Sequence, residues 1–129
     1  MKKILIVEDD EKYAIALGMR LKANGYSVLV AYDALTGVTV ANRQEPDLIL
    51  LDVAMPVGGG FSVAERLHNS VTTAAIPIIF MTGSTDPDVR RRAIEEYGAA
   101  GFLEKPFETP DLLTAIKEAL TPTVEATLS

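Results

Sequence analysis

The sequence predicts a single α/β domain built on a five-stranded parallel sheet with helices on both faces. Three observations carry this prediction. Short aliphatic runs alternate with segments of helical periodicity, two of the runs end abruptly in acidic residues, and glycine or proline marks most of the turns. Alternation of apolar strands with helices indicates parallel strands joined by right-handed crossovers.

The first half of the chain contains three expected strands. Ile4–Val7 and Asp47–Leu51 hold continuous aliphatic runs, typical of strands buried on both faces. Ser27–Ala31 has a mixed pattern that suits the edge of a sheet. The two expected helices are Glu11–Asn24, with Ala14, Leu17, Gly18 and Leu21 on one face and Gly25 as its stop, and Ala34–Arg43, with Asp33 as its N-cap.

The second half adds two strands and three helices. Ile76–Met81 is apolar throughout, and Gly101–Leu103 is short. Met55–Gly60 is expected to be a loop, because it carries Pro56 and three consecutive glycines. The expected helices are Phe61–Asn69, Asp86–Tyr97 with Gly98 as its stop, and Pro110–Leu120 with Leu113, Ile116 and Leu120 facing inward.

Five such units fit the strand order 2-1-3-4-5 of a flavodoxin-like, doubly wound sheet. The first and third strands are neighbours in that order, so the residues at their carboxyl ends converge. A length of 129 residues allows one core. We expect one domain over residues 1–121 and a flexible tail over residues 122–129, which contain Pro122 and small polar residues.

Composition narrows the classes of function. The net charge of −6 argues against nucleic acid as a direct partner. The absence of cysteine excludes a disulfide framework and a thiol nucleophile. No apolar run approaches the roughly 20 residues of a membrane helix, and the start resembles no signal peptide. We therefore expect a cytoplasmic monomer or weak dimer without membrane contact.

Acidic residues end the first and third strands. Glu8, Asp9 and Asp10 follow Val7, and Asp52 ends the run Leu48–Leu51. The carboxyl ends of such strands form the rim where open α/β sheets bind ligands. Asp9 and Asp52 are oxygen ligands suited to Mg²⁺, and Glu8 can hold a metal-bound water. The ordinary alternative is an acidic helix cap, which Asp10 suits best.

Two further polar side chains follow the fourth and fifth strands. The hydroxyl of Thr82 could hydrogen-bond a phosphoryl oxygen, with Gly83 leaving access open. The ammonium of Lys105 could neutralise phosphate charge, and Pro106 allows a cis peptide bond. Taken singly, each has a simpler explanation, as a turn threonine and a solvated lysine.

The remaining histidine and a basic run are expected on the surface. His68 is the only histidine, so it has no partner for a catalytic triad or a histidine metal site. Arg90–Arg92 is expected to be a solvated helix face.

The conjunction of four motifs is much more specific than any one of them. Together they closely resemble the receiver domain of bacterial two-component response regulators, over residues 2 to about 120. The four motifs come in this order, each at the end of an expected strand: Val7–Asp10 (VEDD), Leu50–Pro56 (LLDVAMP), Met81–Gly83 (MTG) and Phe102–Phe107 (FLEKPF).

This resemblance implies a phosphoacceptor site. Asp52 would accept a phosphoryl group from a histidine kinase or a phosphotransfer protein. Asp9, Asp52 and the main-chain carbonyl of Ala54 would bind Mg²⁺, with Glu8 supporting a coordinated water. The side chains of Ala54 and Ser84 would flank the path of a hydrolytic water.

The resemblance also implies a switch and a partner surface. Thr82 and Lys105 would contact the phosphoryl group. Phe102, where many relatives have tyrosine, would turn inward as Thr82 moves, and a downstream protein would bind near Phe102 and the last two helices. The chain would be a stand-alone receiver that catalyses only its own phosphorylation and dephosphorylation. The loop Val57–Gly60 departs from the usual pattern, because it has no acidic residue before its glycines.

Three alternatives compete with a receiver. A haloacid-dehalogenase-like phosphatase would want a second acid two residues after Asp52, where this chain has Ala54. A pseudo-receiver that works without phosphorylation has no need for intact Asp9, Asp52, Thr82 and Lys105. A flavin carrier would want a hydroxyl-rich phosphate loop where Glu8 begins an acidic run.

Overall fold

A parallel sheet with strand order β2-β1-β3-β4-β5 forms the centre of the molecule and confirms the predicted topology. The computed structural model describes residues 1–56 and 59–121. β2 lies at the edge of the sheet, as its mixed pattern predicts. The strands are β1 (Lys3–Val7), β2 (Ser27–Ala31), β3 (Leu48–Asp52), β4 (Ile78–Thr82) and β5 (Gly101–Glu104).

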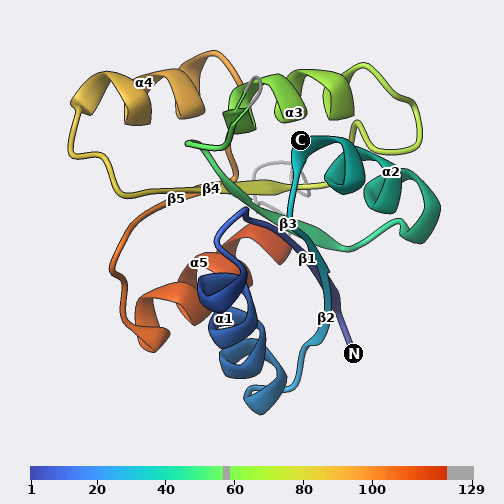
Figure 1. Ribbon diagram of the computed structural model, residues 1–129, viewed down its shortest axis with the longest axis vertical. Coiled ribbons are helices and arrows are strands. Elements are labelled where there is room, and N and C mark those ends of the chain that lie inside the picture. The colour runs from blue at the N-terminus through green and yellow to red at the C-terminus, as the bar shows by residue number, and fades with distance from the viewer. Residues whose placement is uncertain (57–58, 122–129) are drawn as a thin grey trace, which may run out of the picture.

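Five helices cover both faces of this sheet (Figure 1). α1 and α5 lie on one face, and α2, α3 and α4 lie on the other. None of these described helices has the length and apolarity needed to cross a membrane. The helices are α1 (Glu11–Ala23), α2 (Ala34–Gln44), α3 (Gly59–His68), α4 (Pro87–Glu95) and α5 (Thr109–Leu120).

The aliphatic strands serve two separate cores. Successive side chains of a strand point to opposite faces, so Leu5 and Val7 of β1 pack with residues of α2, α3 and α4. Ile4 and Ile6 of the same strand pack with residues of α1 and α5. All four are fully buried, and each such side chain contributes about 2 kcal/mol of burial free energy. Because helices cover both faces of the sheet, the run Ile4–Val7 has to be apolar at every position.

The expected helix signals are confirmed at α1 and α2. The Asp10 side chain accepts a hydrogen bond from the backbone N–H of Tyr13 at 3.1 Å, and Asp33 caps α2 through Thr36 at 2.8 Å. Gly25 follows α1 with φ of 89°, a left-handed conformation that glycine adopts without strain.

Two central strands lie slightly later in the chain than predicted. Asp47 precedes β3, and Asp52 is the last residue of that strand rather than the residue after it. β4 begins at Ile78 instead of Ile76, because Pro77 has no N–H to donate to a neighbouring strand. The shift makes Asp52 part of the hydrogen-bonded ladder, which restricts its backbone.

Two helical predictions also need correction. Leu112 and Ile116 are the buried residues of α5, whereas Leu113 is only half-buried. Gly59 and Gly60 belong to the first turn of α3, although the sequence predicts a loop there. The tail predicted for residues 122–129 lies outside the described residues, as do positions 57 and 58.

Gly60 permits a close approach between α3 and the end of β3. A Cβ at this position would stand 2.2 Å from the backbone oxygen of Asp52 and 3.1 Å from the Cα of Val53. The N–H of Gly60 donates to the carbonyl of Val53 at 2.9 Å. The helix therefore rests directly on the backbone that presents the Asp52 carboxylate.

We expect Gly60→Ala to lower the free energy of unfolding by about 2 kcal/mol, because backbone atoms must move to admit the methyl group. Gly18→Ala is the matched control. Its Cβ would meet only side-chain methyl groups, of Val28 at 3.4 Å and of Ile6 at 3.8 Å, and alanine favours a helix by about 1 kcal/mol over glycine. Urea unfolding measures both variants. Equal stability of the two variants would contradict the close approach.

Candidate functional site

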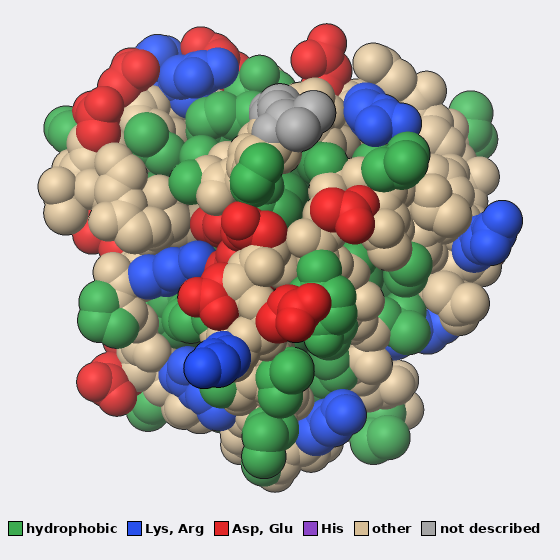
Figure 2. Space-filling model, in the orientation of Figure 1, with side chains coloured by type: hydrophobic (Ala, Val, Ile, Leu, Met, Phe, Trp, Pro, Cys, Tyr) green, Lys and Arg blue, Asp and Glu red, His purple; other side chains and the backbone are tan. Residues whose placement is uncertain are grey.

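The carboxyl ends of β1 and β3 bring two acidic segments together. Val7 pairs with Leu51 in the parallel register, so Glu8 and Asp52 follow on adjacent strands. Acidic side chains gather near the centre of the face shown in Figure 2, where these strands end in Figure 1. The convergence expected at the switch point of the sheet is therefore present in the structure.

Three carboxylates form one cluster at this rim. Oxygen atoms of Glu8, Asp9 and Asp52 all lie within 4.8 Å of one another. Glu8 and Asp52 are 1% and 4% exposed, whereas Asp9 faces solvent. A set of close carboxylate oxygens fits a hard divalent cation such as Mg²⁺, which takes one or two carboxylates and keeps several waters.

The Asp9 carboxyl has a pKa above its ordinary value. Desolvation at the strand end contributes most, followed by a hydrogen bond that the protonated Asp9 carboxyl donates to the Glu8 carboxylate and by the negative charge of Glu8. Repulsion between the Asp9 and Glu8 carboxylates is thus a smaller contribution to the raised pKa. A bound cation would relieve this repulsion.

Lys105 supplies the positive charge of the site. Its Nζ donates hydrogen bonds to the Glu8 carboxylate and, at 3.3 Å, to Oδ1 of Asp52. Burial lowers the pKa of Lys105, but the hydrogen bond to Glu8 and the charge of Asp52 outweigh burial and leave the pKa above its ordinary value. The ammonium is therefore retained, and the peptide bond from Lys105 to Pro106 is cis.

Thr82 is buried at the end of β4 and is tied to the segment that follows. Its Oγ1 accepts a hydrogen bond from the N–H of Ser84 at 3.0 Å, and its carbonyl accepts one from the N–H of Lys105 at 2.7 Å. The Ser84 hydroxyl in turn accepts from the N–H of Asp86, which caps α4. A displacement of the Thr82 hydroxyl would therefore act on the start of α4.

Phe102 lies away from the carboxylates, beneath α4. It pairs with Phe80 across the β4–β5 ladder and packs half-buried against the core on that face. The guanidinium of Arg90 stands over its ring, 5.7 Å from the centroid. Ala54 is exposed on the segment that follows β3.

The arginine run on α4 faces solvent, as the sequence predicts, with Arg90 and Arg91 exposed and the Arg92 side chain 40% exposed. Arg91 is exposed and pairs with Asp88 at 2.8 Å and with Glu95 at 3.3 Å. Arg90 and Arg92 also lie over aromatic rings, and the guanidinium of Arg92 is 4.7 Å from the ring centroid of Phe61. His68 is exposed at the end of α3, as expected.

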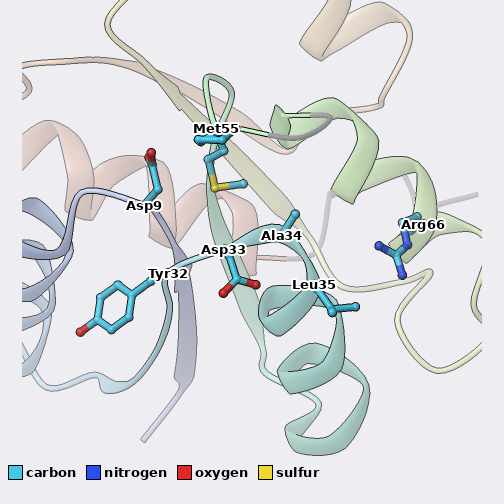
Figure 3. A pocket seen from close by; sticks show the side chains of 8 residues that line it. Asp9, Tyr32, Asp33, Ala34, Leu35, Met55 and Arg66 are labelled. Atoms are coloured by element: carbon cyan, nitrogen blue, oxygen red, sulfur yellow. The ribbon is translucent and has the colours of Figure 1, made fainter.

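A hollow of about 360 Å³ opens beside Asp9 (Figure 3). Its walls come from the segment between β2 and α2, the first residues of α2, the segment after β3, and α3, with Asp9 from just after the end of β1. Met55 and Asp33 lie between Asp9 and Arg66 in this view. The hollow reaches the cluster from the Asp9 side, since neither Asp52 nor Lys105 lines it. Its lining residues are Asp9, Tyr32, Asp33, Ala34, Leu35, Met55, Pro56 and Arg66.

Sequence reasoning missed an aromatic residue at the site. The ring centroid of Tyr13 lies 4.4 Å from Nζ of Lys105. The one available signal was the position of Tyr13, three residues after the Asp10 cap, which places it in the first turn of α1 at the rim.

A family model matches most of the chain, over residues 4–117, and describes the response regulator receiver domain. PilH of Pseudomonas aeruginosa is 33% identical over 93% of this chain and 98% of its own length. RpaA of Synechocystis, a DNA-binding dual master transcriptional regulator, is 32% identical over 93% of this chain. The chain spans 25–49% of the length of the longer curated relatives that it matches.

Solved structures share the same architecture. The chemotaxis protein CheY4 of Vibrio cholerae superposes with a TM-score of 0.87, at 30% identity, over 93% of this chain and 99% of CheY4. The receiver domain of the sensor histidine kinase PA1611 from Pseudomonas aeruginosa has a TM-score of 0.84 at 28% identity, over 92% of this chain and 97% of its own. That receiver holds a magnesium ion in its active-site cleft.

We expect Lys105→Met to lower the free energy of unfolding by about 3 kcal/mol at pH 7, because it leaves two buried carboxylates without their counter-charge. Since the folded-state pKa of Lys105 is raised, its stabilisation is complete below the unfolded pKa of about 10.4. It disappears as pH rises through the folded-state value. The difference between the two proteins should shrink over that interval.

Denaturant unfolding at pH 7 and at alkaline pH measures this difference, with Lys12→Met on the exposed side of α1 as the control. Equal stability of Lys105→Met and the unmodified protein at pH 7 would show that the ammonium does not offset the buried charges.

Proposed function

Because the chain belongs to the response regulator receiver family of two-component signalling systems, we propose that Asp52 accepts a phosphoryl group from a histidine kinase or phosphotransfer protein. The observation that carries the proposal is the nearly buried Asp52 carboxylate, held between further carboxylates and one ammonium. In this proposal residues 1–121 form the receiver domain.

Asp9, Asp52 and the main-chain carbonyl of Ala54 would hold Mg²⁺, and Glu8 would support a metal-coordinated water. The donor set supports this assignment, since all three side chains offer oxygen atoms within 4.8 Å of each other. Bound Mg²⁺ supplies positive charge that neutralises the phosphoryl oxygens. Asp9 carries the more exposed carboxylate and would contribute chiefly to metal affinity.

The chain's own residues orient and neutralise the transferred group. A bond forms between phosphorus and a carboxylate oxygen of Asp52 as the bond from phosphorus to the donor breaks, and the donor keeps that electron pair. Lys105 then turns its ammonium from the carboxylates toward a phosphoryl oxygen. The Thr82 hydroxyl donates to another oxygen while its lone pair still accepts from Ser84. Such transfers depend chiefly on positioning and charge.

Movement of Thr82 would convert the modification into a change of surface. Its hydrogen bond to Ser84 and the following bond to Asp86 lead to the start of α4. Phe102 would turn inward beneath that helix, as a shift between two populated states. We assign the downstream partner surface to α4, β5 and α5, around Phe102.

A phosphatase of the haloacid-dehalogenase type is not favoured. The family match is to a receiver, and Ala54 stands where such an enzyme would need a second acid. The intact carboxylate cluster with its lysine also argues against a receiver that works without phosphorylation.

With Mg²⁺ and acetyl phosphate or phosphoramidate, we expect one acid-stable, base-labile phosphoryl group per chain. Asp52→Asn should abolish labelling, because an amide oxygen is a far weaker nucleophile than a carboxylate. Asp9→Asn should mainly raise the Mg²⁺ concentration required, since it removes an anionic ligand. Intact-mass measurement follows the label. Unchanged labelling of Asp52→Asn would refute the proposed acceptor.

We expect the phosphorylated form to hydrolyse slowly. Ala54 has no group that could orient water, and the Ser84 side chain is short and its hydroxyl is not a base at neutral pH. Orientation of a nucleophile is worth roughly 10²-fold where the geometry is right. Ala54→Asn should therefore change the decay rate of the label in excess Mg²⁺, with little effect on metal affinity. Decay of the unmodified protein within a few seconds would contradict this expectation.

A further inference from the structure

The Lys105 ammonium has an aromatic neighbour that the phosphoacceptor chemistry does not explain. Its Nζ lies 4.4 Å from the centroid of the Tyr13 ring, well inside the range of about 6 Å for attraction between a cation and a ring face. The lysine side chain is 20% exposed, so water does not fully screen this contact. The hydroxyl of Tyr13 plays no part in it.

The backbone under Tyr13 is tied to the same carboxylate cluster. The N–H of Tyr13 donates to Oδ1 of Asp10 at 3.1 Å, and the N–H of Asp10 donates to Oε2 of Glu8 at 3.3 Å. The other oxygen of Glu8 accepts from Lys105. Three hydrogen bonds and one cation–ring contact therefore link Glu8, Asp10, Tyr13 and Lys105 in a closed ring.

The segment after Lys105 also contacts α1. Phe107 meets the Tyr13 ring edge-on, with centroids 6.4 Å apart and an angle of 85° between the planes. The Arg20 guanidinium covers Phe107 at 5.5 Å and donates to its carbonyl and to Oγ1 of Thr109, both at 3.0 Å. These contacts leave the Tyr13 ring little freedom to leave the lysine.

We propose that Tyr13 is a positioning residue for phosphoryl transfer, whose ring face holds the Lys105 ammonium beside Glu8 and Asp52. The inference rests on the proposed role of Lys105 at the phosphoryl group. A lysine has four rotatable side-chain bonds, and its ammonium would otherwise sample solvent through the open side of the site. Tyr13 restricts that sampling before the phosphodonor arrives, which is a form of preorganisation.

Two substitutions separate the ring face from the hydroxyl. With acetyl phosphate and saturating Mg²⁺, Tyr13→Leu should be labelled roughly fivefold more slowly, the order of effect expected for one cation–ring contact. Tyr13→Phe keeps the ring and should be labelled at the rate of the unmodified protein. Tyr26→Leu is the matched control, since Tyr26 packs half-buried against the same core but lies near the start of β2, away from the rim.

NMR of the Lys105 side chain tests the contact independently of chemistry. The ring current of Tyr13 should shift its ε-methylene protons upfield in the unmodified protein and in Tyr13→Phe, and the shift should vanish in Tyr13→Leu. Equal labelling rates in Tyr13→Leu and the unmodified protein, or unmoved Lys105 resonances, would overturn the inference alone. Failure of the unmodified protein to be labelled would instead contradict the proposed function, and the inference with it.

Discussion

The rest of the site depends on the contact of the Lys105 ammonium with the carboxylates of Glu8 and Asp52. These two carboxylates are almost fully buried and lie at the ends of adjacent strands, where their mutual repulsion would otherwise oppose folding. Lys105 is 97 residues from Glu8 and 53 residues from Asp52 along the chain, so these contacts form only when β1, β3 and β5 have assembled in the sheet. An ammonium held in this way is also a ready counter-charge for a phosphoryl group.

The doubly wound order explains why these charges meet. The chain reverses direction across the sheet between β1 and β3, which leaves the ends of both strands uncovered at the rim. Aliphatic residues occupy successive positions along those strands, because helices cover both faces. The polar residues at the carboxyl ends of both strands therefore face the rim, and α3 supports Asp52, the last residue of β3, through the close approach of Gly60.

Strand order, the two covered faces and the caps at Asp10 and Asp33 were predictable, because each depends on local pattern. The limits of β3 and β4 were less so, since pairing with neighbouring strands and the missing N–H of Pro77 decide them. The contact of Tyr13 with Lys105 joins residues from two distant segments, and local pattern carries no record of it. The strand order predicts that Glu8, Asp9 and Asp52 lie together, whereas phosphorylation and metal-binding experiments are needed to establish their roles.

A crystal structure of the protein with Mg²⁺ and beryllofluoride, a mimic of the phosphoryl group, would test the central claim most directly. The account predicts the adduct on a carboxylate oxygen of Asp52 and the metal among the carboxylates of Glu8, Asp9 and Asp52. It also predicts that the Lys105 ammonium and the Thr82 hydroxyl contact the fluorides, with Phe102 turned inward. An adduct on another residue, or Lys105 still bound to Glu8 with no contact to the fluorides, would contradict it.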